Sequence, residues 1–195
     1  MSLRRLAAGC VLAGFEGHEP PDRLRRALAE GLGGVCLFSG NVRDAEQVAA
    51  LTAALRAERP EVLVTVDEEG GDVTRLEWER GSSYPGNLAL GAVDDVGLTE
   101  RVAAAIAGDL LRAGIDVDLA PVADVNSNPL NPVIGVRSFG ADPGPVARHV
   151  AAFVRGLQAG GVAACAKHFP GHGDTAQDSH RELPVARPCL EPFRA

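Results

Sequence analysis

The chain has 195 residues, enough for one domain with a sizeable core and short for two. Hydrophobic residues make up 46% and charged residues 23%, which excludes an intrinsically disordered chain. The formal net charge of −7 disfavours a nucleic-acid-binding protein, which normally carries a basic excess. No stretch reaches the ~18 consecutive apolar residues of a membrane span. The apolar run after Arg5 is too short for a signal peptide. We therefore expect neither nucleic acid nor membrane as a partner.

The cysteine pattern indicates a reducing compartment. None of the cysteines forms a C-x-x-C pair, and three lie in apolar, strand-like runs, where a small buried thiol is the ordinary role. Such a pattern fits free thiols better than a disulfide framework. The cytoplasm is the expected location. The four cysteines are Cys10, Cys36, Cys165 and Cys189.

Short apolar runs alternate with longer segments of helical periodicity along the chain. Residues 68–96 form a long, Gly-rich, charged segment between the third strand and the next helix. The alternation predicts an α/β domain with a parallel sheet, and with no internal repeat or linker, residues 1–195 form one domain. The expected strands are 7–14, 34–38, 62–66, 115–121 and 161–167. The expected helices are 20–30, 42–59, a third with Thr99 as N-cap that stops at Gly114, and a fourth from Pro145 to Gly160.

Polar clusters follow the third, fourth and fifth expected strands, at 67–71, 124–128 and 167–168. Chemistry at strand carboxyl ends suits both a doubly wound sheet and a barrel. No Gly-rich nucleotide fingerprint lies at a strand–helix junction. Sites on several consecutive strands favour a (β/α)8 barrel, which typically needs ~250 residues. We therefore expect only about the first five β/α units, in a chain that is truncated.

Residues 167–180 hold three of the five histidines of the chain. Histidine and aspartate are good metal ligands, but the spacing here is not a standard zinc pattern. Acid/base catalysis is the second interpretation, because an imidazole exchanges protons near neutral pH. Asp178 lies two residues before His180 and could fix its tautomer and stabilise its charged form. An isolated pair of this kind would equally satisfy local turns.

Several other side chains are candidates for binding a sugar. Asp67 follows the third strand directly and could accept hydrogen bonds from two hydroxyls, or cap a loop. Four further side chains could donate to hydroxyls or to a carbonyl. Taken singly, each of them is equally typical of a surface ion pair or a satisfied loop residue. These four are Arg75, Arg137, Lys167 and His168.

Taken together, these segments resemble family 3 glycoside hydrolases in their β-N-acetylglucosaminidase branch. The resemblance runs from Leu6 to Ala195 and rests on four segments. The last segment, K-H-F-P-G-H-G-D-T-A-Q-D-S-H, is the most specific. The segments are 33–41 (GGVCLFSGN), 66–75 (VDEEGGDVTR), 120–125 with 134–140 (APVADV and IGVRSFG), and 167–180.

The resemblance implies the N-terminal part of a barrel that removes β-linked N-acetylglucosamine with retention, from peptidoglycan-derived or related sugars. His180 would be the general acid/base and Asp178 its partner, where most glycosidases use two carboxylates. The family needs no metal or other cofactor. The residues that would bind the sugar are Asp67, Arg75, Arg137, Lys167 and His168.

The sequence departs from the family in three ways. Asp72 stands where this branch often has Arg, and Val136 where it often has Glu, both at the expected pocket edge. The nucleophilic Asp of the family follows a later strand, and no segment after His180 resembles that motif.

The missing nucleophile leaves a non-catalytic sugar-binding half-barrel as an alternative. Phosphorolysis is another, because a neutral imidazole repels phosphate less than a carboxylate does, and a metal-dependent hydrolase is a third. A half-open barrel exposes apolar surface and a sheet edge, so we also expect self-association through that edge.

Overall fold

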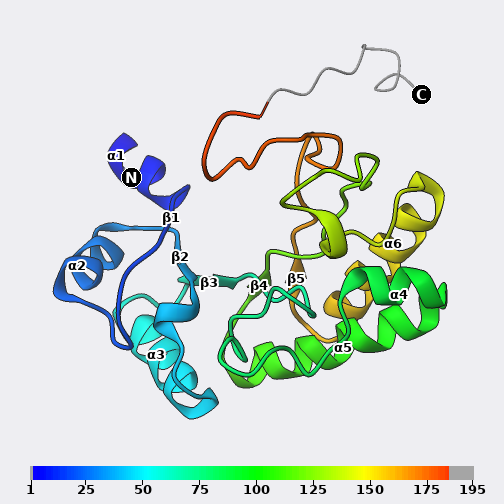
Figure 1. Cartoon of the computed structure of the whole chain (residues 1–195). Coiled ribbons are helices and arrows are strands. Elements are labelled where there is room, and N and C mark those ends of the chain that lie inside the picture. Colours follow the sequence, from blue (N-terminus) through cyan, green and yellow to red (C-terminus); the bar gives the residue numbers. More distant parts are fainter. Residues whose placement is uncertain (1, 185–195) are drawn as a thin grey trace.

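The computed structural model describes residues 2–184. Five parallel strands form one sheet in the order β1-β2-β3-β4-β5, with every strand beside its neighbours in the chain (Figure 1). A doubly wound sheet reverses its strand order at a switch point, whereas a barrel keeps chain order. The α/β fold of barrel type is therefore confirmed, with five strands in the described part. The strands are β1 (Leu12–Ala13), β2 (Gly34–Leu37), β3 (Leu63–Val66), β4 (Val117–Asp118) and β5 (Ala163–Ala164).

Helices α2 to α6 lie between these strands along the chain, whereas α1 precedes β1 (Figure 1). Three helices begin at an aspartate whose carboxylate accepts a hydrogen bond from a backbone N–H of the first turn, namely Asp44, Asp95 and Asp142. The helices are α1 (Leu3–Gly9), α2 (Asp22–Glu30), α3 (Ala45–Glu58), α4 (Asn87–Val93), α5 (Val96–Arg112) and α6 (Pro143–Ala159). Two 3-10 turns are η1 (Ser39–Asn41) and η2 (Gly135–Arg137).

The two faces of the sheet differ in burial. Val64 and Val66 of β3 are fully buried in the core against the helices. Side chains alternate between faces along a strand, and the row on the opposite face contains Leu12 and Leu63, which are 45% and 48% exposed. The apolar exposure expected of a half-open barrel is thus present in the described part. Self-association through it stays a prediction.

The start of the chain corrects two predictions. Residues 7–14 were expected as one buried strand, but residues 3–9 form α1 and only Leu12 and Ala13 pair with β2. The prediction that the thiols are buried is also wrong, because Cys10 and Cys165 are exposed and Cys36 is half-buried. Cys10 ends α1, and Cys165 follows β5, the last strand of the described sheet. Cys189 lies outside the described residues.

The helices also differ from the expectation in several places. The segment 68–96 contains α4, which has only seven residues and no clear apolar period. Asp95, rather than Thr99, caps α5, and Thr99 lies inside the helix, where its hydroxyl hydrogen-bonds His149 of α6 at 2.8 Å. Helix α6 begins at Pro143 rather than at Pro145.

Among residues 2–184, no helix is both long enough and apolar enough to cross a membrane.

The long segment after β3 is anchored to the outside of the sheet by Tyr84. The Tyr84 hydroxyl donates a hydrogen bond to the Asp109 carboxylate on α5, and the Tyr84 carbonyl accepts one from Gly71 N at 3.0 Å. Gly70 and Gly71 both have positive φ, and a Cβ on Gly71 would lie 2.6 Å from Gly86 Cα. Only glycine fits this close approach, so the turn after β3 is held in one position.

We predict that Tyr84 ionises far above the ordinary range. Burial, followed by the hydrogen bond to Asp109, raises its pKa from 10.0 to about 12. Because the pKa is higher in the folded chain, the stability that Tyr84 contributes is complete below pH ~10 and is lost as the pH rises toward 12. Tyr84 is the only tyrosine, so phenolate absorbance reports it alone. Asp109→Asn should lower the midpoint, and a wild-type midpoint near 10 with intact helical circular dichroism would contradict the contact.

Candidate active site

Lys167 joins the carboxyl ends of β3 and β5. Its Nζ lies 2.5 Å from Asp67 Oδ1 and 2.6 Å from Glu69 Oε1. The Lys167 and Asp67 side chains are 15% and 17% exposed, so both retain a small accessible surface. The Glu69 side chain is 1% exposed. Because the parallel strands of one sheet all end on the same edge, residues 100 positions apart meet here across β4.

Two arginines extend this cluster. Arg137 of η2 forms a bidentate pair with Glu69, with Nε 2.9 Å and Nη2 2.8 Å from the two carboxylate oxygens. Arg75 Nη2 lies 3.4 Å from Asp67 Oδ2. We call Asp67, Glu69, Arg75, Arg137 and Lys167 the charge cluster. Its three cations and two carboxylates offer both donors and acceptors for sugar hydroxyls.

The pKa values of the neighbouring carboxyl groups Asp67 and Glu68 are shifted in opposite directions. Burial opposes ionisation of Asp67, but the hydrogen bond and charge of Lys167 and the charge of Arg75 outweigh it, and the pKa of Asp67 is lowered. Burial raises the pKa of Glu68, which accepts hydrogen bonds from the backbone of residues 75 and 76. Burial also raises the pKa of Asp118 well above its usual value. Asp67 is therefore the member of this group that remains an anion most readily.

His168 points to a different partner. Its Nδ1 lies 2.6 Å from Asp124 Oδ2, and the Asp124 side chain is fully buried. The same carboxylate accepts hydrogen bonds from the backbone N–H groups of His168 and His172, at 3.2 and 2.5 Å. Burial would raise the pKa of Asp124, but these hydrogen bonds reverse that effect and lower it.

Asp178 and His180, the acid/base pair predicted from sequence, are hydrogen-bonded to each other. Asp178 Oδ1 accepts hydrogen bonds from His180 N at 2.9 Å and from the His180 ring at Nδ1, 2.7 Å away. These bonds, the backbone bond first, lower the pKa of Asp178. The His180 side chain is 77% exposed, so its Nε2 edge is accessible. An imidazole held at Nδ1 by a carboxylate can donate or accept a proton at Nε2.

The structure brings together most, but not all, of the residues predicted from sequence. Asp67, Arg75, Arg137 and Lys167 meet in the charge cluster, and His168 follows Lys167 directly. The Asp178–His180 dyad makes no hydrogen bond or ion pair with the cluster among the described residues. It connects to the site through His172, whose Nε2 lies 3.0 Å from Ser179 Oγ.

Sequence reasoning missed Glu69 and Asp124 as site residues. Both carboxylates follow a strand within the polar segments already noted, which was the available signal. The pattern does not show which carboxylate of such a segment becomes buried against cations, and Glu69 is the most buried member of the cluster.

No three His, Cys, Asp or Glu side chains between residues 2 and 184 converge as a metal-binding group. The three histidines of 167–180 instead contact separate partners: Asp124, Ser179 with Thr175, and Asp178.

A cavity of about 420 Å³ adjoins the charge cluster. Glu69 and Arg137 line it together with Gly70, Gly71 and Asp72 and with residues 86–89, 92 and 136. Asp72 and Val136, the two departures from the family pattern, both lie on its wall. The volume is within the usual ~300–1,000 Å³ of small-molecule sites.

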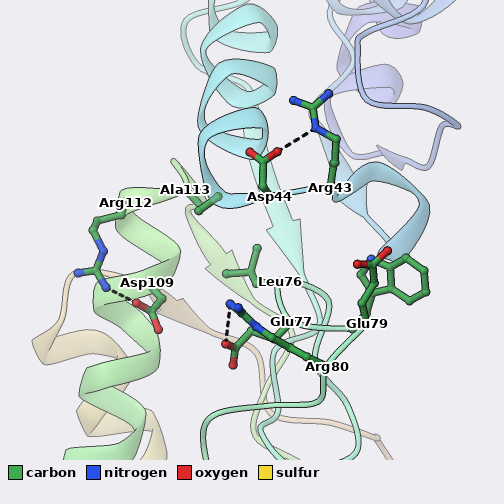
Figure 2. Close-up of a pocket in the computed structure, with 11 residues that line it drawn as sticks. Arg43, Asp44, Leu76, Glu77, Glu79, Arg80, Asp109, Arg112 and Ala113 are labelled. Atoms are coloured by element: carbon green, nitrogen blue, oxygen red, sulfur yellow. Dashed lines mark hydrogen bonds and ion pairs between the residues drawn. The ribbon is translucent and has the colours of Figure 1, made fainter.

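A second pocket of about 410 Å³ lies between α3, α5 and residues 76–80 (Figure 2). Figure 2 shows that most of its charged side chains are paired, in Arg43–Asp44, Arg80–Glu77 and Arg112–Asp109. None of the residues predicted to act in the site lines this pocket. We therefore place the candidate active site at the charge cluster.

Comparison with known proteins identifies the family of the chain. Residues 18–194 match the family model described as "Glycosyl hydrolase family 3 N terminal domain". The chain belongs to glycosyl hydrolase family 3. The resemblance inferred from the four sequence segments is thereby confirmed.

Relatives of this family 3 chain include curated hexosaminidases. Beta-hexosaminidase A of Pseudoalteromonas piscicida is 41% identical over 85% of this chain and 29% of its own length. Beta-hexosaminidase of Bordetella avium is 39% identical over 90% of this chain and 51% of its own length. The family 3 chain therefore spans about half, or less, of these relatives.

Solved structures give the same family. A family 3 β-N-acetylglucosaminidase from Paenibacillus superposes with a TM-score of 0.94 at 42% identity, covering 100% of this chain and 38% of that chain. NagZ from Neisseria gonorrhoeae superposes with a TM-score of 0.86 at 34% identity, covering 94% of this chain and 56% of that chain. The described fold is thus the fold of the corresponding part of these proteins.

We predict that Glu69→Ala destabilises this family 3 domain strongly. The substitution leaves Lys167 and Arg137 without the buried carboxylate they share, and loss of one partner of a buried ion pair costs about 3–5 kcal/mol of unfolding free energy. Denaturant unfolding measures this cost. Glu79 is an exposed carboxylate that lines the second pocket, and Glu79→Ala is the control. Its unfolding free energy should stay within about 0.5 kcal/mol of the wild-type value. Equal effects of both substitutions would contradict the assignment.

Proposed function

We propose that this chain carries the N-acetylglucosamine-binding cluster and the acid/base dyad of a retaining β-N-acetylglucosaminidase. The observation that carries the proposal is the Asp178–His180 pair on the segment that begins at Lys167. One continuous stretch after β5 thus supplies a sugar-binding cation and a proton-transfer group. The hexosaminidase names of the relatives support the same reaction class.

The charge cluster supplies the recognition chemistry in this proposal. Asp67, anionic at neutral pH, accepts hydrogen bonds from sugar hydroxyls. Lys167 and Arg137 donate to hydroxyl or acetamide oxygens from their partly exposed ends. The donors are already oriented by Asp67 and Glu69, so little reorganisation accompanies binding.

The dyad supplies the proton transfers. His180 as imidazolium donates its Nε2 proton to the glycosidic oxygen as the bond to the leaving group breaks. The neutral ring then accepts a proton from the water that releases the sugar. Asp178 keeps the second ring proton on Nδ1 and stabilises the charged form. A retaining reaction also requires a carboxylate nucleophile, which we assign to no residue of this chain.

Peptidoglycan-derived sugars are the proposed substrates, and the cytoplasm is the proposed location. Phosphorolysis is the second candidate reaction, because the dyad places an imidazole where a carboxylate would repel phosphate. Assays with inorganic phosphate separate the two, since phosphorolysis yields the sugar 1-phosphate and hydrolysis the free sugar.

We predict that any hydrolysis of an aryl β-N-acetylglucosaminide by the 195-residue chain, whichever carboxylate serves as its nucleophile, depends on His180. His180→Ala should lower kcat by about 10²–10⁴-fold, the usual contribution of a general acid/base. His18→Ala, an exposed histidine elsewhere in the chain, should leave kcat unchanged. Turnover that survives His180→Ala would overturn the dyad assignment. Sugar binding without turnover by folded wild-type chain would instead support the non-catalytic half-barrel.

We further predict that Asp67→Asn weakens N-acetylglucosamine binding about 10- to 100-fold, because a charge-assisted hydrogen bond is lost. Titration calorimetry measures the affinity, with the exposed Asp22→Asn as control. The lowered pKa of Asp67 means that wild-type affinity persists above pH ~4 and declines as the pH falls below it. An affinity lost already between pH 7 and 5 would exclude Asp67 as the determining group.

A further inference from the structure

Asp124 is a fully buried carboxylate that the proposed reaction does not use. It lies six residues beyond the end of β4, and its side chain has no exposed surface. Three donors surround it: His168 Nδ1 at 2.6 Å and His168 N at 3.2 Å reach Oδ2, and His172 N at 2.5 Å reaches Oδ1. All three donors belong to the segment that follows β5.

This arrangement determines the tautomer of His168. An ionised carboxylate can only accept hydrogen bonds, so the ring nitrogen beside it must carry a proton. Neutral His168 is therefore protonated at Nδ1, and its Nε2 has a free lone pair. Nε2 has no hydrogen-bond partner among residues 2–184, and the ring is 36% exposed beside Lys167. It is available to accept a hydrogen bond from a sugar hydroxyl.

The other oxygen of Asp124 holds the base of the loop that bears the dyad. His172, anchored by its backbone N–H, contacts Thr175 Oγ1 through Nδ1 at 2.6 Å and Ser179 Oγ through Nε2 at 3.0 Å. Ser179 stands between Asp178 and His180. Asn131 Nδ2 also donates a hydrogen bond to the His172 carbonyl at 2.6 Å. Hydrogen bonds therefore hold the loop from His172 to Ser179.

We propose that Asp124 is a positioning residue: one oxygen fixes His168 as an acceptor toward a sugar hydroxyl, and the other seats the loop that carries Asp178 and His180. The proposal rests on the proposed function for its ligand. Its structural content, the protonation site of His168 and the anchoring of His172, is measurable without any ligand.

NMR of chain labelled with ¹⁵N in its histidines directly tests the protonation site of His168 and the hydrogen bond of the His172 amide. In neutral wild-type His168 we expect the proton on Nδ1, and a proton on Nε2 would overturn the proposal without any variant. Asp124→Asn replaces two acceptors by one acceptor and one N–H donor group. We expect that it either moves the His168 proton to Nε2 or leaves the His172 amide without an acceptor, so that this amide exchanges faster.

Asp116→Asn is the matched control. Asp116 precedes β4 at the opposite end of the sheet, accepts a hydrogen bond from Val64 N at 2.8 Å, and pairs with Arg56. It should change neither the His168 tautomer nor the exchange of the His172 amide. A folded Asp124→Asn chain in which both readouts stay as in wild type would overturn the proposal.

Binding of N-acetylglucosamine tests the link to the ligand. Asp124→Asn should weaken the affinity roughly 3- to 10-fold, the effect of one neutral hydrogen bond. In a His168→Ala background the same substitution should have much less effect, since it acts through His168. Equal losses in both backgrounds would refute this action. If wild-type chain binds no sugar, the proposed function fails, while the tautomer still decides the role of Asp124.

Discussion

The ion pairs of Lys167 with Asp67 and Glu69 are the contacts on which the site depends. They join β3 to β5 across β4, over 100 residues of sequence, at one end of the sheet. A largely buried ammonium is stable only with partners of this kind, so the charge cluster requires that these three strands end at the same edge of the sheet. Arg137 reaches the same Glu69 from η2, which adds the long connection after β4 to the same assembly. The cluster is therefore part of the fold as well as of the candidate active site.

The carboxyl groups near this cluster fall into two classes, with lowered or with raised pKa values, according to the groups that they contact. Asp67 and Asp124 are surrounded by N–H groups and cations, and their pKa values are lowered despite burial. Glu68 and Asp118 face the protein interior without a cation in hydrogen-bond contact, and burial raises their pKa values. Neighbours in sequence thus have opposite protonation tendencies, because successive side chains at a strand end point to opposite sides. Only the first pair is suited to accept hydrogen bonds as anions toward a ligand or a histidine.

The strand–helix alternation and the polar segments after β3 and β5 were predictable, because buried parallel strands are continuously apolar and their carboxyl ends carry the polar side chains. Residues 7–14 were misassigned because an apolar octamer does not distinguish a short helix from a strand. Exposure of Cys165 depends on its place after the last described strand, which no local pattern encodes. The burial of Glu69 and Asp124 follows from long-range contacts with Lys167 and His168. The sequence therefore shows that these two positions are polar, but it does not show which residues they contact.

Recognition and turnover have different structural requirements in this chain. Every member of the charge cluster comes from the segments that follow β3, β4 and β5, so the proposed sugar recognition requires only the side chains on these three segments. The dyad lies farther along the segment after β5, and His172 and Asp124 link it to His168, the residue that follows Lys167 of the cluster. In the proposed reaction, proton transfer depends on a loop that is held at His172 by Asp124, the same carboxylate that contacts His168. A change at Asp124 should therefore alter recognition and proton transfer together, whereas a change at His180 should alter proton transfer alone.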